Sequence, residues 1–196
     1  MDRLDHRTLT GGMTTTTTRT ATIKRSHTAT STTAPPDPSP ARPVPAAVRA
    51  AIAKRSFCTL ATTSVGGRSH VAGVLYVACG DVLYVNTLRP SRKARNIDVC
   101  GTAAVCIPVR RLPVGPPSSI QFQGPAQLVA LDAPEITELV AGGALKAITG
   151  HGELEAADGC FLRIDVPKVV HTYGLGLSLR QLLRDPLHAG ARVELS

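Results

Sequence analysis

Tryptophan is absent from the chain, and the only aromatic residues are three phenylalanines and three tyrosines. A core must therefore be built from aliphatic side chains, and single-stranded nucleic acid would find few rings on which to stack. No apolar run approaches the roughly 20 residues that cross a bilayer. No apolar stretch follows the first charged residues, which argues against a secretory signal. We therefore expect a cytoplasmic protein with no membrane contact.

Paired cysteine and histidine motifs are also missing. The six histidines show no i,i+4 spacing, so no metal site is predicted. The cysteines are odd in number and include no C-x-x-C pair, which argues against a disulfide framework and for a reducing compartment. We expect most of them to be small buried side chains. The five are Cys58, Cys79, Cys100, Cys106 and Cys160.

Acidic residues are scarce, with 14 against 22 Lys and Arg, which gives a net charge of +8. A basic surplus suits an anionic small molecule, nucleic acid or a membrane surface, and does not choose between them.

Residues 1–45 differ in composition from the rest. Met13 is followed by five threonines, and residues 34–40 are rich in proline. Large apolar residues are almost absent, so this segment is predicted to be a disordered tail. Its composition also resembles that of an organelle transit peptide, and Met13 is an alternative start. Residues 46–196 are expected to form one folded domain.

Six segments of the domain have strand character, and most of them meet through short turns. One of them, the apolar run 70–78, is expected to be covered on both faces. Short helices are predicted at 46–54, at 92–99, after Asp132 (with Glu135 as an acidic capping box) and at 177–184. This pattern indicates a mainly β fold, a small antiparallel barrel. The six strands are expected at 57–62, 70–78, 82–87, 102–109, 120–124 and 162–166, the last continuing towards Tyr173.

The most informative stretch is Ser91-Arg92-Lys93. Ser91 is a good N-cap. The two cations would then stand in the first helical turn, where the macrodipole disfavours them by roughly 0.3–1 kcal/mol each. Free N–H groups at a helix start form a natural phosphate site, and the cations would complete it. The alternative is a solvated basic helix end.

Other candidates for chemistry are weaker. Cys58 and Cys106 lie in apolar strands, where structural burial is favoured over reactivity. Gly174 and Gly176 lack the context of a dinucleotide loop. His171 is a candidate ligand contact, although a hydrogen-bonded strand histidine is the favoured interpretation.

The order of elements adds to the motif: a hairpin, a strand that ends in Asn86-Thr87, the Ser-Arg-Lys helix start, then strand, loop and a strand that ends in glycine. Over residues 46–173 this order resembles the pyridoxamine 5′-phosphate oxidase-like family of flavin-binding split barrels. The resemblance implies a six-stranded antiparallel split β-barrel with a few short helices. It also implies FMN as cofactor and a homodimer with the cofactor at the interface.

The resemblance assigns roles to particular residues. Arg92 and Lys93, behind the cap residue Ser91, would bind the cofactor phosphate, and the strand-end pair would line the cofactor. The preceding strand would run alongside its ring. Ser119 stands where the family has glutamine, and Gln121 on the same face is its expected substitute. The full set of expected cofactor-binding residues is Val71, Ala72, Tyr76, Asn86, Thr87, Ser91, Arg92, Lys93, Ser119 and Gln121.

The chain also departs from the family. It lacks the Arg-x-His motif and the tryptophan-containing tail of the true oxidases, which puts vitamin B6 oxidation in doubt. Relatives with a Ser-Arg-Lys-x-Arg-Asn motif use the deazaflavin F420, whose acidic tail Arg89 or Arg95 would contact. The expected function is an FMN-dependent oxidoreductase that acts on an unknown small molecule. The alternatives are an F420-dependent reductase, a carrier or sensor without turnover, and a basic nucleic-acid-binding module, which the shortage of aromatics disfavours. Because the redox chemistry belongs to the cofactor, no catalytic side chain is named.

Overall fold

A computed structural model describes residues 43–109 and 118–195. The expected tail, apart from its last three residues, and Met13 lie outside the described residues, as does most of the loop between the strands expected at 102–109 and 120–124. The described parts form nine strands, four α-helices and three short 3-10 helices. The helices are α1 (Pro45–Lys54), α2 (Arg92–Cys100), α3 (Pro134–Ala141) and α4 (Leu179–Arg184). The strands are β1 (Phe57–Thr63), β2 (Ser69–Leu75), β3 (Val77–Cys79), β4 (Val82–Leu88), β5 (Thr102–Val109), β6 (Ser118–Ala130), β7 (Gly159–Asp165), β8 (Val169–Tyr173) and β9 (Gly190–Glu194).

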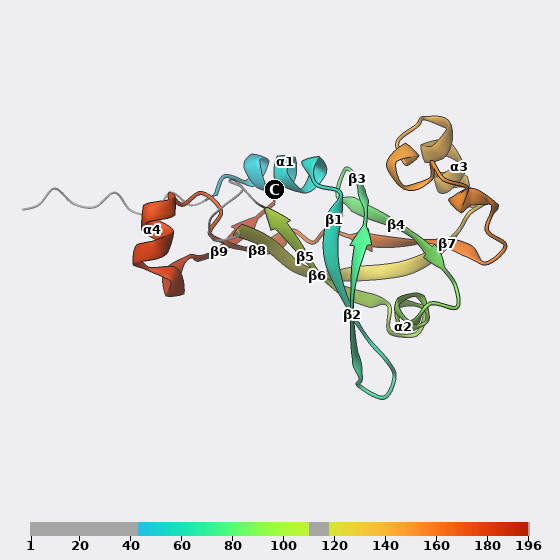
Figure 1. Ribbon diagram of the computed structural model, residues 1–196, viewed down its shortest axis with the longest axis horizontal. Coiled ribbons are helices and arrows are strands. Elements are labelled where there is room, and N and C mark those ends of the chain that lie inside the picture. The colour runs from blue at the N-terminus through green and yellow to red at the C-terminus, as the bar shows by residue number, and fades with distance from the viewer. Residues whose placement is uncertain (1–42, 110–117, 196) are drawn as a thin grey trace, which may run out of the picture. The chain divides into compact units, whose positions relative to one another are not determined.

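Every strand pairing is antiparallel, and the strands form two sheets that share β6. We call the sheet of β2, β1, β5, the first half of β6, β8 and β9 the larger sheet. The smaller sheet contains the second half of β6, β7, β4 and β3. In Figure 1, β6 runs from beside β5 to beside β7 and so joins the two. The mainly β, antiparallel split-barrel fold is thereby confirmed.

The change of sheet along β6 occurs at Gly124-Pro125. Residues 118–125 pair with β5, and residues 126–130 pair with β7. A Cβ atom on Gly124 would collide with the carbonyl oxygen of Asp165 on β7. The missing side chain therefore allows one strand to serve both sheets.

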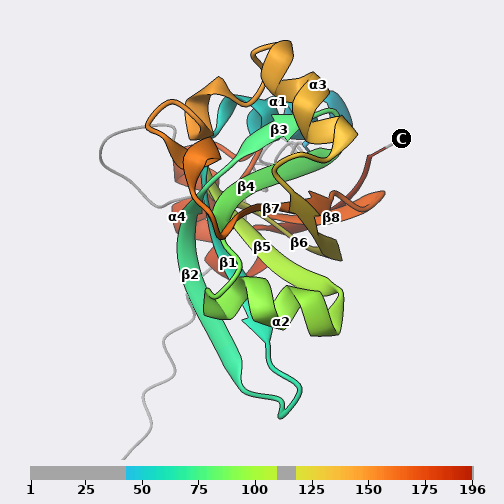
Figure 2. The same ribbon diagram turned by 90° about the vertical axis from the view of Figure 1, so that its right-hand side faces the viewer.

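The main core lies between the sheets and is mostly aliphatic. Its members include Leu60, Leu83, Val105 and Leu162, all nearly inaccessible. A second cluster, around Phe161 and Ile136, packs α3 against the far face of the smaller sheet. Figure 2 shows α3 and α2 on opposite sides of the strands.

Several predicted elements need correction. The run 70–78 forms two strands, β2 and β3, because the strand is interrupted at Tyr76. The run is not covered on both faces. Pro167 likewise separates β7 from β8, and β9 was not predicted, so the described residues hold nine strands instead of six. Asp132 does not cap α3, whose N-cap is Ala133 without a side-chain bond.

Over the described part of the chain, no helix is both long enough and apolar enough to cross a membrane.

Candidate functional site

Helix α2 begins where the sequence predicts. Ser91 is the N-cap, and its hydroxyl accepts a hydrogen bond from the Ala94 backbone N–H at 3.4 Å. The same hydroxyl lies 3.3 Å from the hydroxyl of Thr87, at the end of β4. Thr87 is buried. These contacts fix the helix start against the strand end, so that the first-turn N–H groups have a defined position.

Four cations surround this helix start. Lys93 is half-buried, and Arg89, Arg92 and Arg95 are exposed. Within the described residues, none of the four side chains makes an ion pair or a hydrogen bond. Unpaired cations at the positive end of a helix repel one another and the macrodipole. An anion bound there would relieve this repulsion.

Two of these cations act on the same neighbour. Burial raises the pKa of the Cys160 thiol, and the charges of Arg89 and Lys93 oppose that shift. The Arg89 backbone N–H also donates to the Asp158 carbonyl at 2.8 Å. The cationic side chains of the β4–α2 turn therefore lie next to the start of β7.

The side-chain nitrogen of Asn86 is buried and has no hydrogen-bond partner among the described residues. Leaving such a donor unpaired costs roughly 1–3 kcal/mol, so a buried orphan calls for an explanation. Asn86 pairs with Phe161 and so points to the face of the smaller sheet that α3 covers, away from α2, and its orphaned amide gives no support to a ligand at the helix start. The four cations around the capped start of α2 fit a cofactor that bears a phosphate.

The expected ring-lining residues of β2 do not share one environment. Strand β2 is an edge strand of the larger sheet. Val71 points outward and is exposed, whereas Ala72 points inward and packs on the core. Tyr76 has no exposed surface, and its hydroxyl donates to the Ile52 carbonyl at 2.8 Å. In this chain Tyr76 packs against α1, and its burial gives no support to contact with a cofactor.

The outward face of the larger sheet carries a hollow of about 680 Å³. Cross-strand pairing produces it, because paired residues point to the same face. Small side chains form its floor on β2, β1 and β5, and longer or ring-bearing ones rise along β6 and β8. The floor contains Val71, Thr59, Ala61, Ala104 and Cys106, and the wall contains Gln121, Gln123, Pro167, Val169 and His171.

The expected residues therefore fall into three groups. Thr87, Ser91, Arg92 and Lys93 meet at the start of α2, whereas Asn86, from the same strand end, points to the opposite face of the smaller sheet. Val71, Ser119 and Gln121 lie on the outward face of the larger sheet, where the Gln121 amide donates to the Ser119 hydroxyl at 2.9 Å. Ala72 and Tyr76 point into the core.

The first two groups lie on different faces of the larger sheet. Helix α2 contributes Ala94 and Ile97 to the core, so it packs on the inward face. One chain thus brings together the residues expected to bind the phosphate. It does not bring the outward residues Val71, Ser119 and Gln121 to them.

His171 is the main residue that sequence reasoning undervalued. It is a strand residue, as expected, but it is exposed, lines the hollow and has no hydrogen bond among the described residues. The pairing of His171 with Gln121, and of Gln121 with Cys106, places the three in one row. This register depends on long-range strand pairing, which no local pattern contains.

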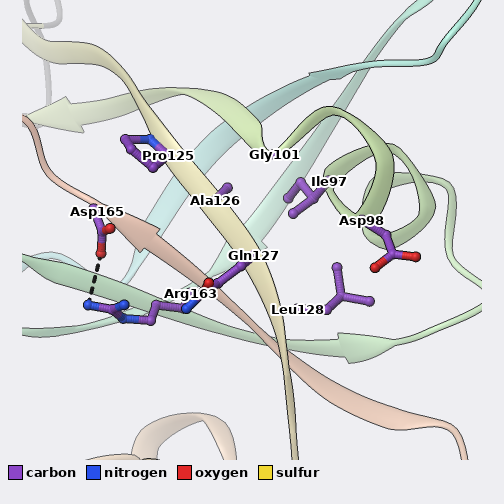
Figure 3. A pocket seen from close by; sticks show the side chains of 9 residues that line it. All are labelled: Ile97, Asp98, Gly101, Pro125, Ala126, Gln127, Leu128, Arg163 and Asp165. Carbon is purple, nitrogen blue, oxygen red and sulfur yellow. Dashed lines mark ion pairs between the residues drawn. The ribbon is translucent and has the colours of Figure 1, made fainter.

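A smaller hollow of about 390 Å³ lies near the C-terminal end of α2 (Figure 3) and contains none of the ten expected residues. Arg163 lines this hollow, and its guanidinium pairs with Asp165 at 3.1 Å and with Glu135 at 3.9 Å. The cation is thereby already neutralised, and we assign no ligand to this hollow.

Comparison with known families shows to which family the chain belongs. The profile described as pyridoxamine 5′-phosphate oxidase matches residues 44–171. The chain belongs to this family. The match covers β1 to most of β8 and includes the helix start at Ser91. A comparison with curated proteins gave no match.

Several solved structures share the fold of this chain. A haem-binding protein from Mycobacterium smegmatis has a TM-score of 0.60 at 17% identity, covering 78% of this chain and 59% of that one. HutZ, the haem storage protein of Vibrio cholerae, has a TM-score of 0.54 at 18% identity, covering 63% and 89%. An FAD-binding protein from Mesorhizobium loti has a TM-score of 0.52 at 18% identity, covering 63% and 87%. At these identities the likeness concerns the fold alone.

Proposed function

We propose that the chain is an oxidoreductase that binds FMN through its phosphate at the start of α2 and acts on a small molecule. The observation that carries the proposal is the set of four cations around a capped helix start, none of which has an ion pair or side-chain hydrogen bond within the described part of the chain. F420 is the alternative cofactor, since it also carries a phosphate on a ribityl chain.

In this proposal each residue has a limited task. Ser91 fixes the helix start, and Arg92 and Lys93 neutralise the phosphate. The cofactor supplies the hydride chemistry. The protein binds it, orients it and excludes water.

We further propose that the working form is a homodimer. The phosphate-binding residues and the outward residues Val71 and Gln121 lie on different faces of one chain. A cofactor that contacts both groups therefore requires a second chain, and the exposed apolar edge of the larger sheet supports such an association.

Haem is less well supported than a flavin. Two neighbours of similar fold are named for haem, and His171 offers a free imidazole at the larger hollow. Haem carries two carboxylates, however, and no Lys or Arg stands among the described residues that line this hollow. The cations are gathered instead around α2.

The test is a titration of the purified protein with FMN and F420, followed by flavin fluorescence, with riboflavin as the ligand that lacks the phosphate. Replacing both Arg92 and Lys93 with alanine should weaken FMN binding at least about a hundredfold, because each charge-assisted hydrogen bond is worth about 1.5–3 kcal/mol. Riboflavin binding should change little.

The matched control replaces Lys168 and Arg180, two exposed cations outside the proposed site, and should leave FMN affinity unchanged. Wild-type protein that binds neither FMN nor F420 at micromolar concentrations would overturn the proposal. Equal loss in both double variants would show only a response to net charge. A Soret band on titration with haemin, without flavin binding, would favour haem.

A further inference from the structure

The outward hollow of the larger sheet is built by two neighbouring rows of paired residues. One row joins Thr59, Cys106, Gln121 and His171, and the next joins Val71, Ala61, Ala104 and Gln123. Along both rows the side chains are short on β1 and β5 and longer on β6 and β8. The result is a flat floor with a raised rim on one side.

An aromatic ring lies near the β2 end of the first row, outside the lining of the hollow. A Cβ atom on Gly73 would lie 3.0 Å from two ring carbons of Phe57, so this ring lies over the glycine. Gly73 is the β2 partner of Thr59 and continues the first row. The floor is therefore shaped by residue size, with the ring of Phe57 near one margin.

The chemistry of the lining is unusual for this chain. The protein carries a net charge of +8, yet no Asp, Glu, Lys or Arg is found among the described residues around the hollow. Its polar groups are two amides, one hydroxyl, one thiol and the imidazole of His171. A charged ligand would lose its hydration there without gaining an opposite charge. An uncharged ligand would lose little.

The dimensions suit a small molecule. About 680 Å³ lies within the roughly 300–1,000 Å³ that is usual for small-molecule sites, which are mostly apolar with a few convergent polar groups. A flat floor of methyl-sized side chains matches the face of a planar ring. The amides of Gln121 and Gln123 stand at its edge, where they can bond carbonyl or ring-nitrogen atoms.

We propose that this hollow is the substrate site and that it takes an uncharged, planar ring compound with hydrogen-bonding atoms at its edge. The inference rests on the proposed function, because the bound molecule is a substrate only if the protein is an oxidoreductase. Binding in the hollow does not itself require a flavin. The cations at α2 of one chain bind the anionic cofactor, which reaches Val71 and Gln121 of the second chain, and the rest of the uncharged hollow selects a neutral partner for it.

The experiment compares two probes that differ in one charge, 7-methoxycoumarin and its 3-carboxylate. Binding is measured by equilibrium dialysis, with and without saturating FMN. The neutral probe should bind at least tenfold more tightly. Attraction to a protein of net charge +8 alone would favour the carboxylate. A preference for the carboxylate therefore overturns the proposal.

Variants locate the binding. Ala104→Glu places a charge on the floor and should weaken binding of the neutral probe at least tenfold, and Ala104→Leu should do so by filling the space. Ala141→Glu, at an exposed position of α3, is the matched control and should have no effect. Far-ultraviolet circular dichroism verifies that each variant is folded, and Ala104→Leu serves if the glutamate variant is not.

The remaining outcomes are also decisive. If neither probe binds and Ala104→Glu converts a dimer to a monomer, the face is a contact between two chains and the proposal is wrong. If FMN binds through Lys93 and the neutral probe does not bind, the proposed function stands and this inference fails. If the neutral probe binds and FMN does not, the hollow is a ligand site and the flavin assignment fails.

Discussion

The hydroxyl of Tyr76 holds helix α1 on the sheet. It donates to the Ile52 carbonyl near the C-terminal end of that helix, and the whole side chain is buried. Burial, with a further contribution from Cys58, raises the pKa of this phenol above its ordinary value of 10. Tyr76 thus makes a polar contact inside an aliphatic core, where the loss of a hydrogen bond is costly.

Tyr76→Phe should therefore destabilise the fold by roughly 1 kcal/mol, since it removes the buried hydrogen bond to the Ile52 carbonyl and leaves only the one from the Arg55 backbone N–H, at 3.3 Å. The pH dependence should change too. Above pH 10 the unfolded chain releases the Tyr76 proton before the folded chain does, so the free energy of unfolding falls with rising pH. The phenylalanine variant lacks this contribution, and its free energy should fall less steeply above pH 10. Urea unfolding at pH 7 and at pH 10 to 11 measures both effects.

Tyr173→Phe, on β8, is the control, because the Tyr173 side chain has no hydrogen bond among the described residues. The same variants settle the expected role of Tyr76 at the cofactor. A stability loss with unchanged FMN affinity would assign the residue to packing. A loss of FMN affinity without loss of stability would restore it to the cofactor site.

At the scale of elements, β6 determines the shape of the barrel. The strand is 13 residues long and leaves one sheet for the other at Gly124-Pro125, where β7 approaches so closely that no side chain fits. A proline in the interior of a sheet removes a backbone donor, and it is tolerated here because the pairing partner changes at this point.

Gly124→Ala should destabilise the protein by several kcal/mol, since the added methyl group must displace the backbone of Asp165. Thermal and urea unfolding measure the loss. Gly66→Ala is the matched control, because nothing lies within 4 Å of its added methyl group. Similar small effects of the two changes would mean that β6 can move away from β7 at little cost.

The elements also show what can be predicted from sequence. Local signals were sufficient for α1, α2 and β5. Helix α1 is rich in alanine and begins at a proline, α2 lies between the cap Ser91 and Gly101, and burial alternates along β5. The break of the run 70–78 at Tyr76 was missed because its apolar pattern continues across the break. The continuation of β6 past Pro125 was missed because proline is an ordinary stop signal. Both depend on partners distant in sequence.

The same distinction applies to the candidate site. The helix start that is proposed to bind an anion is local, and Ser91, Arg92 and Lys93 could be named from a short motif. The hollow is not local, since its residues come from five strands and are brought together by register. His171 and Ala104 therefore carried no recognisable signal until the pairing was known.

At the scale of the whole molecule, the apolar margin of the larger sheet is the feature that the isolated chain leaves exposed. Phe57 and Leu75 are paired neighbours on β1 and β2, with 45% and 57% of their surfaces exposed, and Val71 is 62% exposed. Apolar neighbours on an edge strand are avoided in monomers, since they invite association. A second copy of the chain is the partner that the proposed function requires.

Leu75→Arg should therefore weaken self-association. In a two-fold symmetric contact each substitution counts twice, so the loss of one buried leucine per chain costs about 3 kcal/mol, or roughly a hundredfold in the dimer dissociation constant. Sedimentation at a series of concentrations measures it. Val65→Arg, in the exposed turn between β1 and β2, adds the same charge elsewhere and should leave the dimer intact. Because the cofactor is proposed to contact both chains, FMN affinity should fall together with dimerisation. A wild-type protein that is monomeric at micromolar concentrations and still binds FMN tightly would show that one chain forms the whole site.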